Sequence, residues 1–258
     1  MFVKSRYHVR IKTKRIGSAA RDEDVADRQK RLPGFVQEAI EKASLLFIGA
    51  GGINSEYGEG TVRKGYGRLT FFDPDLTEYS NLSRQLFFKE DIGKKKGVCI
   101  AKNLSRFATC GSVIEGWGYS FQDAVALGHP LDADVVICGV DNNTARVEVS
   151  KFFRAKNIPV VFTAVDLMAE SGYVFVQEVG KACFGCCFPD CLNNIKIPCR
   201  TPAAKDILKT VAGMGMYAID SLIMDRKRNW NYRLVHIAGF APDIKTTIEK
   251  NPKCPLCE

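Results

Sequence analysis

The sequence has no long apolar run, and this absence narrows the classes of protein to which it can belong. Its longest apolar runs, such as 135–138 and 160–162, fall far short of the roughly 18 residues that a membrane-spanning helix needs. Residues 1–17 carry charge but lack the apolar segment and the small-residue cleavage site of a secretory signal. We therefore expect a chain without membrane spans that resides in the cytoplasm.

The sequence does contain enough apolar material for a sizeable core. Its 258 residues are 46% hydrophobic, which suits one large domain, or at most two, and excludes a disordered tail or a small stapled peptide. Lys and Arg number 37 against 29 Asp and Glu, so the formal net charge is +8. This excess favours an anionic ligand or partner, and nucleotide, nucleic acid and an acidic protein all remain open.

The first segment of the chain is strongly basic. Residues 1–15 carry six Lys and Arg side chains and no acidic one, and residues 7–12 alternate at the period of a strand. We expect a basic edge strand or arm, with a solvated tail as the alternative. Residues 1–22 are therefore assigned as a basic N-terminal arm, and residues 23–258 as the main domain.

Strand and helix patterns alternate along the main domain. LLFIGAGGIN (45–54) predicts a strand and a Gly-rich turn that leads into a helix, and further strands are expected over 134–140 and 159–165. Val- and Ile-rich strands that alternate with helices are typical of a parallel sheet covered on both faces. The alternating segment 173–179 and two strands after residue 231 predict a C-terminal antiparallel extension. The expected fold is thus α/β, with a Rossmann-like, doubly wound and mostly parallel sheet.

The Gly-rich turn indicates a nucleotide site. Gly49, Gly51 and Gly52 lie between an apolar strand and a helix, where glycines let the backbone approach a phosphate at the helix N-terminus. Asp73 ends the next strand, where a carboxylate accepts hydrogen bonds from ribose hydroxyls. An NAD-dependent oxidoreductase fits these features equally well, and a tight turn with a capping aspartate is the structural alternative. The cations that follow, Arg84 and three lysines, suit a triphosphate better than a dinucleotide.

Six short motifs follow one another along the chain: DRQKRLPG (27–34), GAGGIN (49–54), DPD (73–75), SNLSRQ (80–85), GKKK (93–96) and CGVDNNTAR (138–146). In this order and at these spacings the sequence resembles the ThiF/MoeB/HesA family, the ATP-dependent activators of ubiquitin-like proteins. The resemblance extends over about residues 27–257. It implies that the main domain, 23–258, is an adenylation domain.

The resemblance also implies roles for individual residues. One group of side chains would surround the phosphates of ATP: Asn81, Arg84, Gln85 and Lys96. Asp73 would hold the ribose, and Asp141 would bind magnesium. Arg28 matches an arginine that reaches across a dimer interface into the neighbouring subunit's ATP, which implies a homodimer. Asn54 departs from the family, because it stands where the motif has a glycine that lets the helix pack closely.

The implied reaction needs cations rather than a general base. A C-terminal carboxylate has a pKa of about 3.5, so at pH 7 it is already an ionised nucleophile for the α-phosphate. Positive groups would neutralise the phosphates and stabilise the pyrophosphate leaving group: Arg28, Arg84, Lys96 and a magnesium ion on Asp141. Two simpler roles are the alternatives, a solvated basic face for Arg84 and Lys96 and a helix cap for Asp141. Because Asp141 ends a buried strand, its carboxylate would be costly without a cation.

The ten cysteines predict a second kind of site, because disulfides are rare in a reducing compartment. Two C-x-x-C pairs offer the four thiolates of a closed, structural zinc site: Cys183, Cys186, Cys254 and Cys257. Cys187 and Cys191 lie beside the first pair and could replace it as ligands, so the sequence does not decide which four cysteines would bind the ion. Free thiols are the alternative.

Cys199 lies in the region where several members of the family carry the cysteine that receives the activated acyl group. A thiolate beside Arg200 and a helix start would have a lowered pKa and attack the acyl-adenylate. MoeB-type members have a cysteine at the like position that they do not need. Catalysis and an inert thiol are therefore both open for Cys199.

We expect a homodimeric enzyme that uses Mg-ATP to adenylate the C-terminal glycine of a ubiquitin-like or sulfur-carrier protein and releases pyrophosphate. The acyl-adenylate then passes to sulfur, with a sulfurtransferase as partner, or to a thiol, with a conjugating enzyme as partner. Two other classes are kept as alternatives: an NAD-dependent oxidoreductase and a nucleic-acid-binding module with a vestigial nucleotide site. The first lacks an evident hydride-transfer site, and complete ATP motifs argue against the second.

Overall fold

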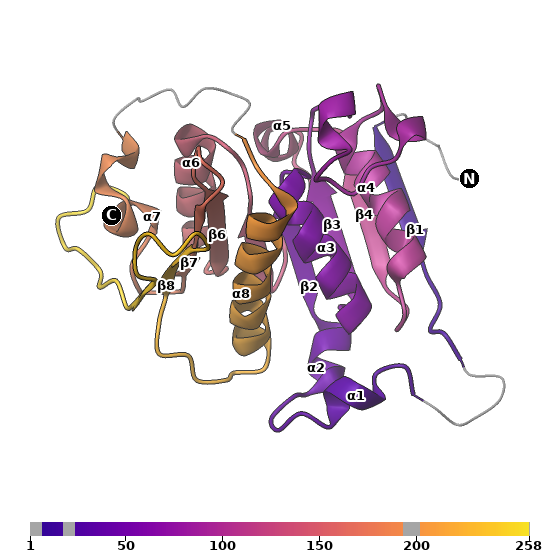
Figure 1. Ribbon diagram of the computed structural model, residues 1–258, viewed down its shortest axis with the longest axis horizontal. Coiled ribbons are helices and arrows are strands. Elements are labelled where there is room, and N and C mark those ends of the chain that lie inside the picture. Colours follow the sequence, from indigo (N-terminus) through magenta and orange to yellow (C-terminus); the bar gives the residue numbers. More distant parts are fainter. Residues whose placement is uncertain (1–6, 18–23, 193–201, 258) are drawn as a thin grey trace.

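The computed structural model describes residues 7–17, 24–192 and 202–257, and these contain one mixed sheet with helices beside it (Figure 1). The strands are β1 (His8–Lys12), β2 (Ser44–Ile48), β3 (Arg68–Phe72), β4 (Val113–Trp117), β5 (Val135–Cys138), β6 (Val160–Val165), β7 (Ser171–Gln177), β8 (Tyr232–His236) and β9 (Ile244–Thr246). The α-helices are α1 (Asp27–Lys30), α2 (Gln37–Lys42), α3 (Gly52–Lys64), α4 (Lys96–Leu104), α5 (Phe121–Ala126), α6 (Asn143–Ala155), α7 (Phe184–Cys187) and α8 (Lys205–Ile223). Among the described residues, no helix is both long and apolar enough to cross a membrane.

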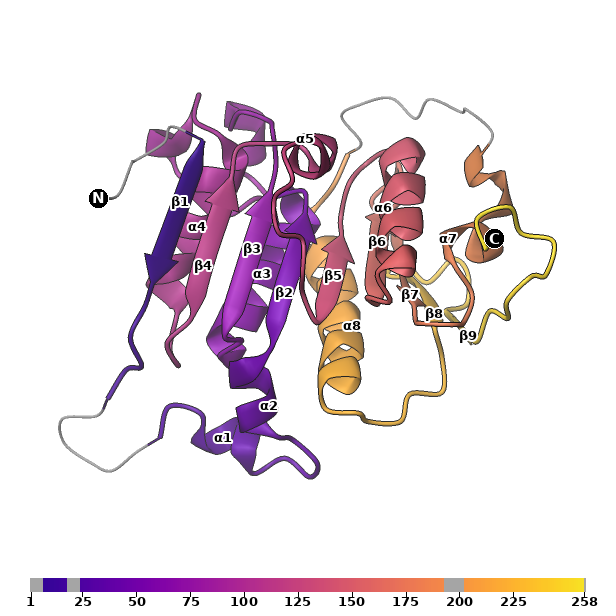
Figure 2. The ribbon, with the colours of Figure 1, turned by 180° about the vertical axis from the view of Figure 1, so that it is seen from behind.

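The centre of the sheet is parallel. In the order β1-β4-β3-β2-β5-β6-β7-β8-β9, every pairing from β4 to β6 is parallel, and β2 and β5 are almost entirely buried. Helices α3, α4 and α8 cover one face (Figure 1), and α5 and α6 cover the other (Figure 2). Strands buried on both sides explain the continuous Val, Ile and Phe runs. The predicted Rossmann-like, doubly wound α/β fold is confirmed.

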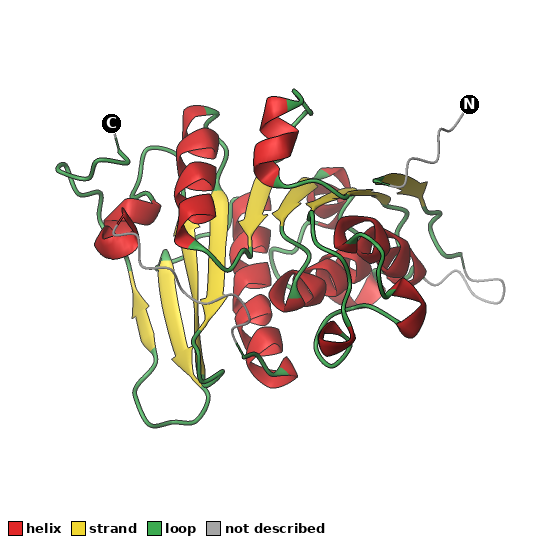
Figure 3. Ribbon diagram, turned by 90° about the horizontal axis from the view of Figure 1, so that it is seen from above, coloured by secondary structure: helices red, strands yellow, loops and turns green. Residues whose placement is uncertain are grey.

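Antiparallel strands extend the sheet at both ends. Strands β7, β8 and β9 pair antiparallel after β6, so the predicted C-terminal antiparallel extension is confirmed. Figure 3 shows the sheet twisting along its length, as sheets of L-residues do. At the opposite end, β1 pairs antiparallel with β4 and is the basic edge strand predicted from the alternation, with Arg10 paired to Glu115 of β4.

Strand β4 and helix α4 have no counterpart in the sequence prediction. The sequence of β4, VIEGW, contains a charge and a glycine, so it offers no continuous apolar run. Tertiary contact stabilises both elements, because α4 lies so close to β4 that a Cβ on Gly97 would meet the Trp117 carbonyl oxygen at 2.1 Å. This close approach brings Lys96, the first residue of α4, to the carboxyl end of β4.

Candidate functional site

The Gly-rich turn lies where the chain order in the sheet reverses. From β2 the chain proceeds through β3 to β4 on one side and returns to β5 on the other, so β2 and β5 flank the switch point at which such sheets bind ligands. Gly49 has φ +91°, a left-handed conformation that disfavours other residues, and an added Cβ would lie 3.4 Å from the Gly139 carbonyl oxygen. The loop after β5 therefore packs directly on the turn.

Asn54 keeps α3 close to the sheet, although it replaces the glycine of the family motif. Its side chain is fully buried, and Nδ2 donates hydrogen bonds to the carbonyls of Ile48, at 3.0 Å, and Gly49, at 2.8 Å. The Asn54 side chain fits there because residue 139 is a glycine. A Cβ at position 139 would lie only 2.5 Å from Asn54 Oδ1. The departure from the motif therefore leaves the helix tightly packed and braces the turn.

Asp73 follows β3 and is tied to the same turn. Its side chain accepts hydrogen bonds from the backbone amides of Ala50, at 2.7 Å, and Asp75, at 2.9 Å. Burial raises the pKa of the Asp73 carboxyl to about 6, while nearby Lys96 lowers it and Asp75 raises it. Each carboxylate oxygen retains a second acceptor site for a ligand hydroxyl.

Lys96 lies beside the carboxylates of Asp73 and Asp75. Its Nζ is 3.1 Å from Asp75 Oδ2, and its side chain is only 12% exposed. The solvated basic face considered as an alternative for Lys96 is therefore wrong. The ammonium group instead lies in the region enclosed by the ends of β3 and α4.

The SNLSRQ segment brings Arg84 over the N-terminus of α3. Asn81 is buried and its Oδ1 accepts the Glu78 amide at 3.0 Å, which holds the short turn that precedes Arg84. Arg84 Nη1 donates to the Ser80 carbonyl at 2.7 Å, and its Cγ lies 3.7 Å from where a Cβ on Gly52 would be. Within the described residues, the buried Oε1 of Gln85 has no hydrogen-bond partner.

Asp141 lies in the loop that packs on the Gly-rich turn, but its environment differs from the prediction. The side chain is exposed, so the expected cost of burying its carboxylate does not arise. The helix cap proposed as the alternative is also wrong, because Oδ1 of the next residue, Asn142, accepts the Ala145 amide at 2.8 Å and caps α6. Buried Arg146 braces the loop by donating to the Val140 carbonyl at 2.7 Å.

The fold thus gathers most of the predicted site residues at one edge of the sheet. The Gly-rich turn, Asp73, Lys96 and Asp141 all lie at carboxyl ends of parallel strands, and Arg84 contacts the same turn. The free amides and dipole at the N-terminus of α3 add positive potential to that of the cations. An anion with a sugar attached suits this arrangement.

Arg28 is separated from that edge within one chain. It is exposed on α1, and its neighbour Gln29 donates to the Lys64 carbonyl, at 2.8 Å, at the C-terminal end of α3. Because α3 has 13 residues, it separates Arg28 from the Gly-rich turn by about 20 Å. Within the described residues of one chain, Arg28 therefore does not reach the Gly-rich turn.

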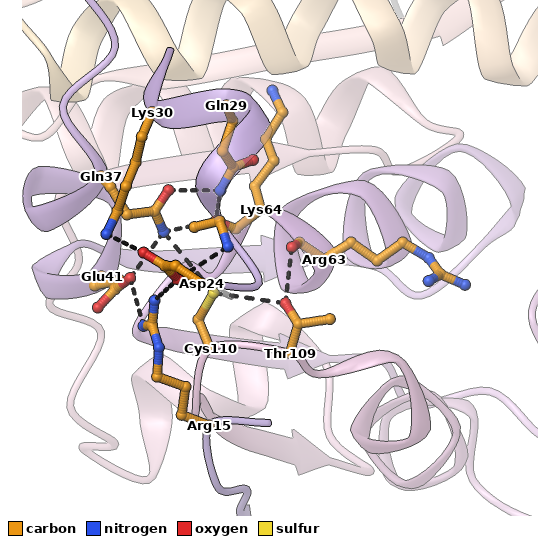
Figure 4. A network of polar contacts seen from close by, with 11 residues as sticks. Arg15, Asp24, Gln29, Lys30, Gln37, Glu41, Arg63, Lys64, Thr109 and Cys110 are labelled. Atoms are coloured by element: carbon orange, nitrogen blue, oxygen red, sulfur yellow. Dashed lines mark hydrogen bonds and ion pairs between the residues drawn. The ribbon is translucent and has the colours of Figure 1, made fainter. Parts of the chain in front are cut away.

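A network of charged side chains fixes α1 in place (Figure 4). Arg15 binds Asp24 and, at 2.9 Å, Glu41 of α2, while Lys30 of α1 binds the other oxygen of Asp24. The Lys30 ammonium, the Ala26 backbone amide and Arg15 hold the pKa of Asp24 well below its usual range. The basic segment before α1 thus anchors the helix that carries Arg28.

Four cysteines from two distant segments form the second site. The sulfurs of Cys183, Cys186, Cys254 and Cys257 all lie within 4.8 Å of one another. The Sγ–Sγ distances include 3.7 Å between Cys183 and Cys186 and 3.3 Å between Cys186 and Cys257. Tetrahedral zinc with Zn–S bonds of about 2.3 Å places its sulfurs about 3.8 Å apart, so this cluster suits zinc.

The cluster also shows which four cysteines lie together, a choice that the sequence left open. Cys187 and Cys191 are not among its members. The cluster joins α7 to the C-terminal tail, where Cys254 and Leu256 are buried against Gly185. Cys199, the candidate acyl-accepting thiol, lies outside the described residues.

One ion pair beside the turn was not predicted. Glu56 of α3 binds Lys205 of α8, and Lys205 Nζ also donates to the Arg84 carbonyl at 3.4 Å. The two residues are 149 positions apart, and neither belongs to one of the six motifs. Only the packing of α8 against α3 reveals the pair.

A doubly wound sheet with a glycine-rich turn at its switch point defines the class of nucleotide-binding α/β proteins. Residues 22–256 match the model of the ThiF family, and the chain belongs to this family. The resemblance found in the sequence is therefore confirmed.

Curated relatives agree with the family. A sulfur carrier protein adenylyltransferase of Thermus thermophilus is 29% identical over 230 residues, which cover 86% of this chain and 84% of the relative. A ubiquitin-like modifier-activating enzyme 5 of Drosophila grimshawi is 29% identical over 167 residues, covering 59% of this chain and 41% of that enzyme. The prediction of an enzyme of this adenylyltransferase class is confirmed, and neither the oxidoreductase nor the nucleic-acid-binding alternative is favoured.

Solved structures show the same fold. E. coli MccB with ATP has a TM-score of 0.72 and 18% identity, over 88% of this chain and 69% of the MccB chain. PaaA has a TM-score of 0.68 and 19% identity, over 88% of this chain and 73% of the PaaA chain. At these identities the likeness concerns the architecture alone.

Proposed function

We propose that this protein adenylates the C-terminal glycine of a ubiquitin-like or sulfur-carrier protein with Mg-ATP and releases pyrophosphate. The observation that supports the proposal is the surroundings of the Gly-rich turn: Arg84 contacts the turn, Lys96 lies near Asp73, which is hydrogen-bonded to the turn, and Asp141 belongs to the loop that packs on it. The names of the two curated relatives support the class of carrier protein.

The proposed reaction begins with the binding of ATP at the N-terminus of α3. The turn amides would receive phosphate oxygens, and Asp73, already fixed by two backbone amides, would accept the ribose hydroxyls. The carrier's carboxylate then forms a bond to the α-phosphorus, while the bond from that phosphorus to the bridging oxygen breaks and pyrophosphate departs. Arg84 and Lys96 would stabilise the negative charge that shifts onto the leaving group.

Magnesium fits this arrangement through Asp141. Magnesium in nucleotide enzymes is commonly held by one or two carboxylates together with phosphate oxygens and water. Asp141 is an exposed carboxylate without a hydrogen-bond partner in the described part of the chain, beside the turn that would hold the phosphates. When bound, the ion would neutralise phosphate charge.

Zinc fits the four-cysteine cluster, where it would have a structural role. A closed set of four thiolates leaves no position for a substrate, so the ion would join the C-terminal tail to α7. This role needs no contact with ATP.

A homodimer would complete the site. Arg28 lies about one length of α3 away from its own Gly-rich turn and is exposed. The network of Arg15, Asp24 and Glu41 fixes its helix, which suits a residue presented to a second copy of the chain. We assign Arg28 to the neighbouring subunit's ATP.

ATP–pyrophosphate exchange tests the proposed function. Purified protein with Mg-ATP, labelled pyrophosphate and candidate carrier proteins ending in Gly-Gly is expected to form labelled ATP. A carrier that lacks its last glycine is the matched control and is expected to support no exchange. Tight NAD binding without ATP binding, or salt-dependent RNA binding without exchange, would contradict the proposal.

The affinity for Mg-ATP is expected to fall as the pH decreases through 6. Burial raises the pKa of Asp73 to about 6, and only its ionised form accepts both ribose hydroxyls. The protonated form dominates below that pH, so affinity should decrease by about tenfold between pH 7 and pH 5. Calorimetry gives the dissociation constant for Mg-ATP of the wild type and of Asp73→Asn at each pH. The ratio of the two constants cancels the titration of ATP itself. A ratio that stays constant over this range would show that Asp73 does not hold the nucleotide.

A further inference from the structure

Glu56 and Lys205 form an ion pair directly beside the phosphate-binding turn. Glu56 lies four residues after Gly52 on α3, so both residues are on the same face of the helix, one turn apart. Its side chain is only 8% exposed, and among the described residues Lys205 is the cation that pairs with it. Lys205 is the first residue of α8.

The packing of α8 on α3 places this pair in contact with the candidate site. Leu208, one turn along α8 from Lys205, lies so close to Gly52 that an added Cβ would be 2.7 Å from its Cδ1. Lys205 Nζ also reaches the backbone carbonyl of Arg84 at 3.4 Å. Figure 1 shows the two helices side by side on the same face of the sheet.

Glu56 presents an electrostatic problem for a phosphate site. An anion binds at a helix N-terminus because the first-turn amides and the helix dipole are positive there. A buried carboxylate one turn further along opposes this attraction, since charges in a poorly solvated region are weakly screened. The ammonium group of Lys205 compensates for this negative charge.

We propose that Lys205 is a positioning residue of the ATP site, which neutralises Glu56 and thereby permits a triphosphate to bind at the N-terminus of α3. Lys205 acts through Glu56 rather than by touching the nucleotide. This inference rests on the proposed ATP-dependent function and adds two residues to its site.

Calorimetric titration of the full chain with Mg-ATP tests this role. Lys205→Met is expected to weaken binding by about tenfold or more, because it leaves Glu56 uncompensated. The double variant Glu56→Gln/Lys205→Met is expected to recover binding to within about threefold of the wild type, since no buried charge remains. Glu56→Gln alone should bind at least as tightly as the wild type.

Lys209→Met is the matched control. Lys209 is exposed on the same helix, so its replacement removes the same charge without uncovering Glu56 and should leave binding unchanged. Thermal melting of every variant reports whether it is folded. If Lys205→Met is unfolded, the comparison of Glu56→Gln with the wild type decides, and weaker binding by Glu56→Gln would overturn the inference.

Two other results would also overturn it. Wild-type affinity in Lys205→Met would show that compensation of Glu56 is unimportant, and a double variant as weak as Lys205→Met would show that Lys205 acts on the phosphates or through Arg84. A folded wild type that binds no Mg-ATP would instead refute the proposed function, and the inference with it.

Discussion

Lys96→Ala is expected to reduce ATP–pyrophosphate exchange by roughly 100- to 1,000-fold, the loss typical of removing one preorganised group that stabilises transition-state charge. Lys96 is nearly buried and lies 3.1 Å from Asp75, close to Asp73. Its removal both withdraws a cation from the phosphates and leaves two neighbouring carboxylates uncompensated, and these carboxylates would repel ATP. Steady-state exchange rates over a range of ATP concentrations measure the effect.

Asp141→Ala is expected to cause a loss of similar size in the same assay, because it removes the carboxylate proposed to hold magnesium. Its exposure means that the substitution should not impair folding. The control variants are Lys94→Ala, an exposed lysine of the same run, and Asp132→Ala, which lies before β5 at the opposite end from Asp141. Exchange within about threefold of the wild type in Lys96→Ala or Asp141→Ala would remove that residue from the mechanism.

Cys254→Ser is expected to lose the bound zinc and to lower the melting temperature by roughly 10 °C or more, since a structural zinc site contributes several kcal/mol and each kcal/mol shifts a domain of this size by about 2–4 °C. The cluster holds the tail that buries Leu256 against Gly185, so its loss releases apolar surface as well. Elemental analysis of the purified protein and thermal melting measure the two effects.

Cys187→Ala is the matched control for this prediction. Cys187 adjoins the ligand Cys186 but is not a member of the cluster, so the variant should retain one zinc per chain. A chelator should lower the melting temperature of the wild type toward that of Cys254→Ser and leave Cys254→Ser unchanged. Full zinc content in Cys254→Ser, or a wild type that holds no zinc, would contradict the assignment.

Much of the fold was predictable because its signals are local. The strands β2, β5 and β6 each contain an apolar run of at least three residues, and the helix α6 between β5 and β6 has its own cap in Asn142. Strand β4 was missed because Glu115 and Gly116 interrupt its apolar pattern. Its pairing with β1 and β3 and the close approach of α4 supply the stability that its sequence pattern does not indicate.

The residues of the candidate site also fall into those that the sequence predicted and those that it did not. The glycines, Asp73, Arg84 and Lys96 were identified from motifs whose spacing reflects their place at the ends of strands and helices. The environment of Asp141 was misjudged, because a sequence shows where a strand ends but not which side chain of the following loop points to solvent. The Glu56–Lys205 pair gave no signal at all, since neither residue stands in a motif.

By itself, the sequence determined the central strands β2, β3, β5 and β6, the glycine turn and the two cysteine pairs, because hydrophobic period and short motif spacing are properties of neighbouring residues. Only the tertiary structure decided which cysteines meet, that Arg28 lies far from its own chain's turn, and that Lys205 compensates for Glu56. Those facts depend on how helices pack across the sheet. Contacts between residues far apart in the sequence arise from packing and leave no local pattern.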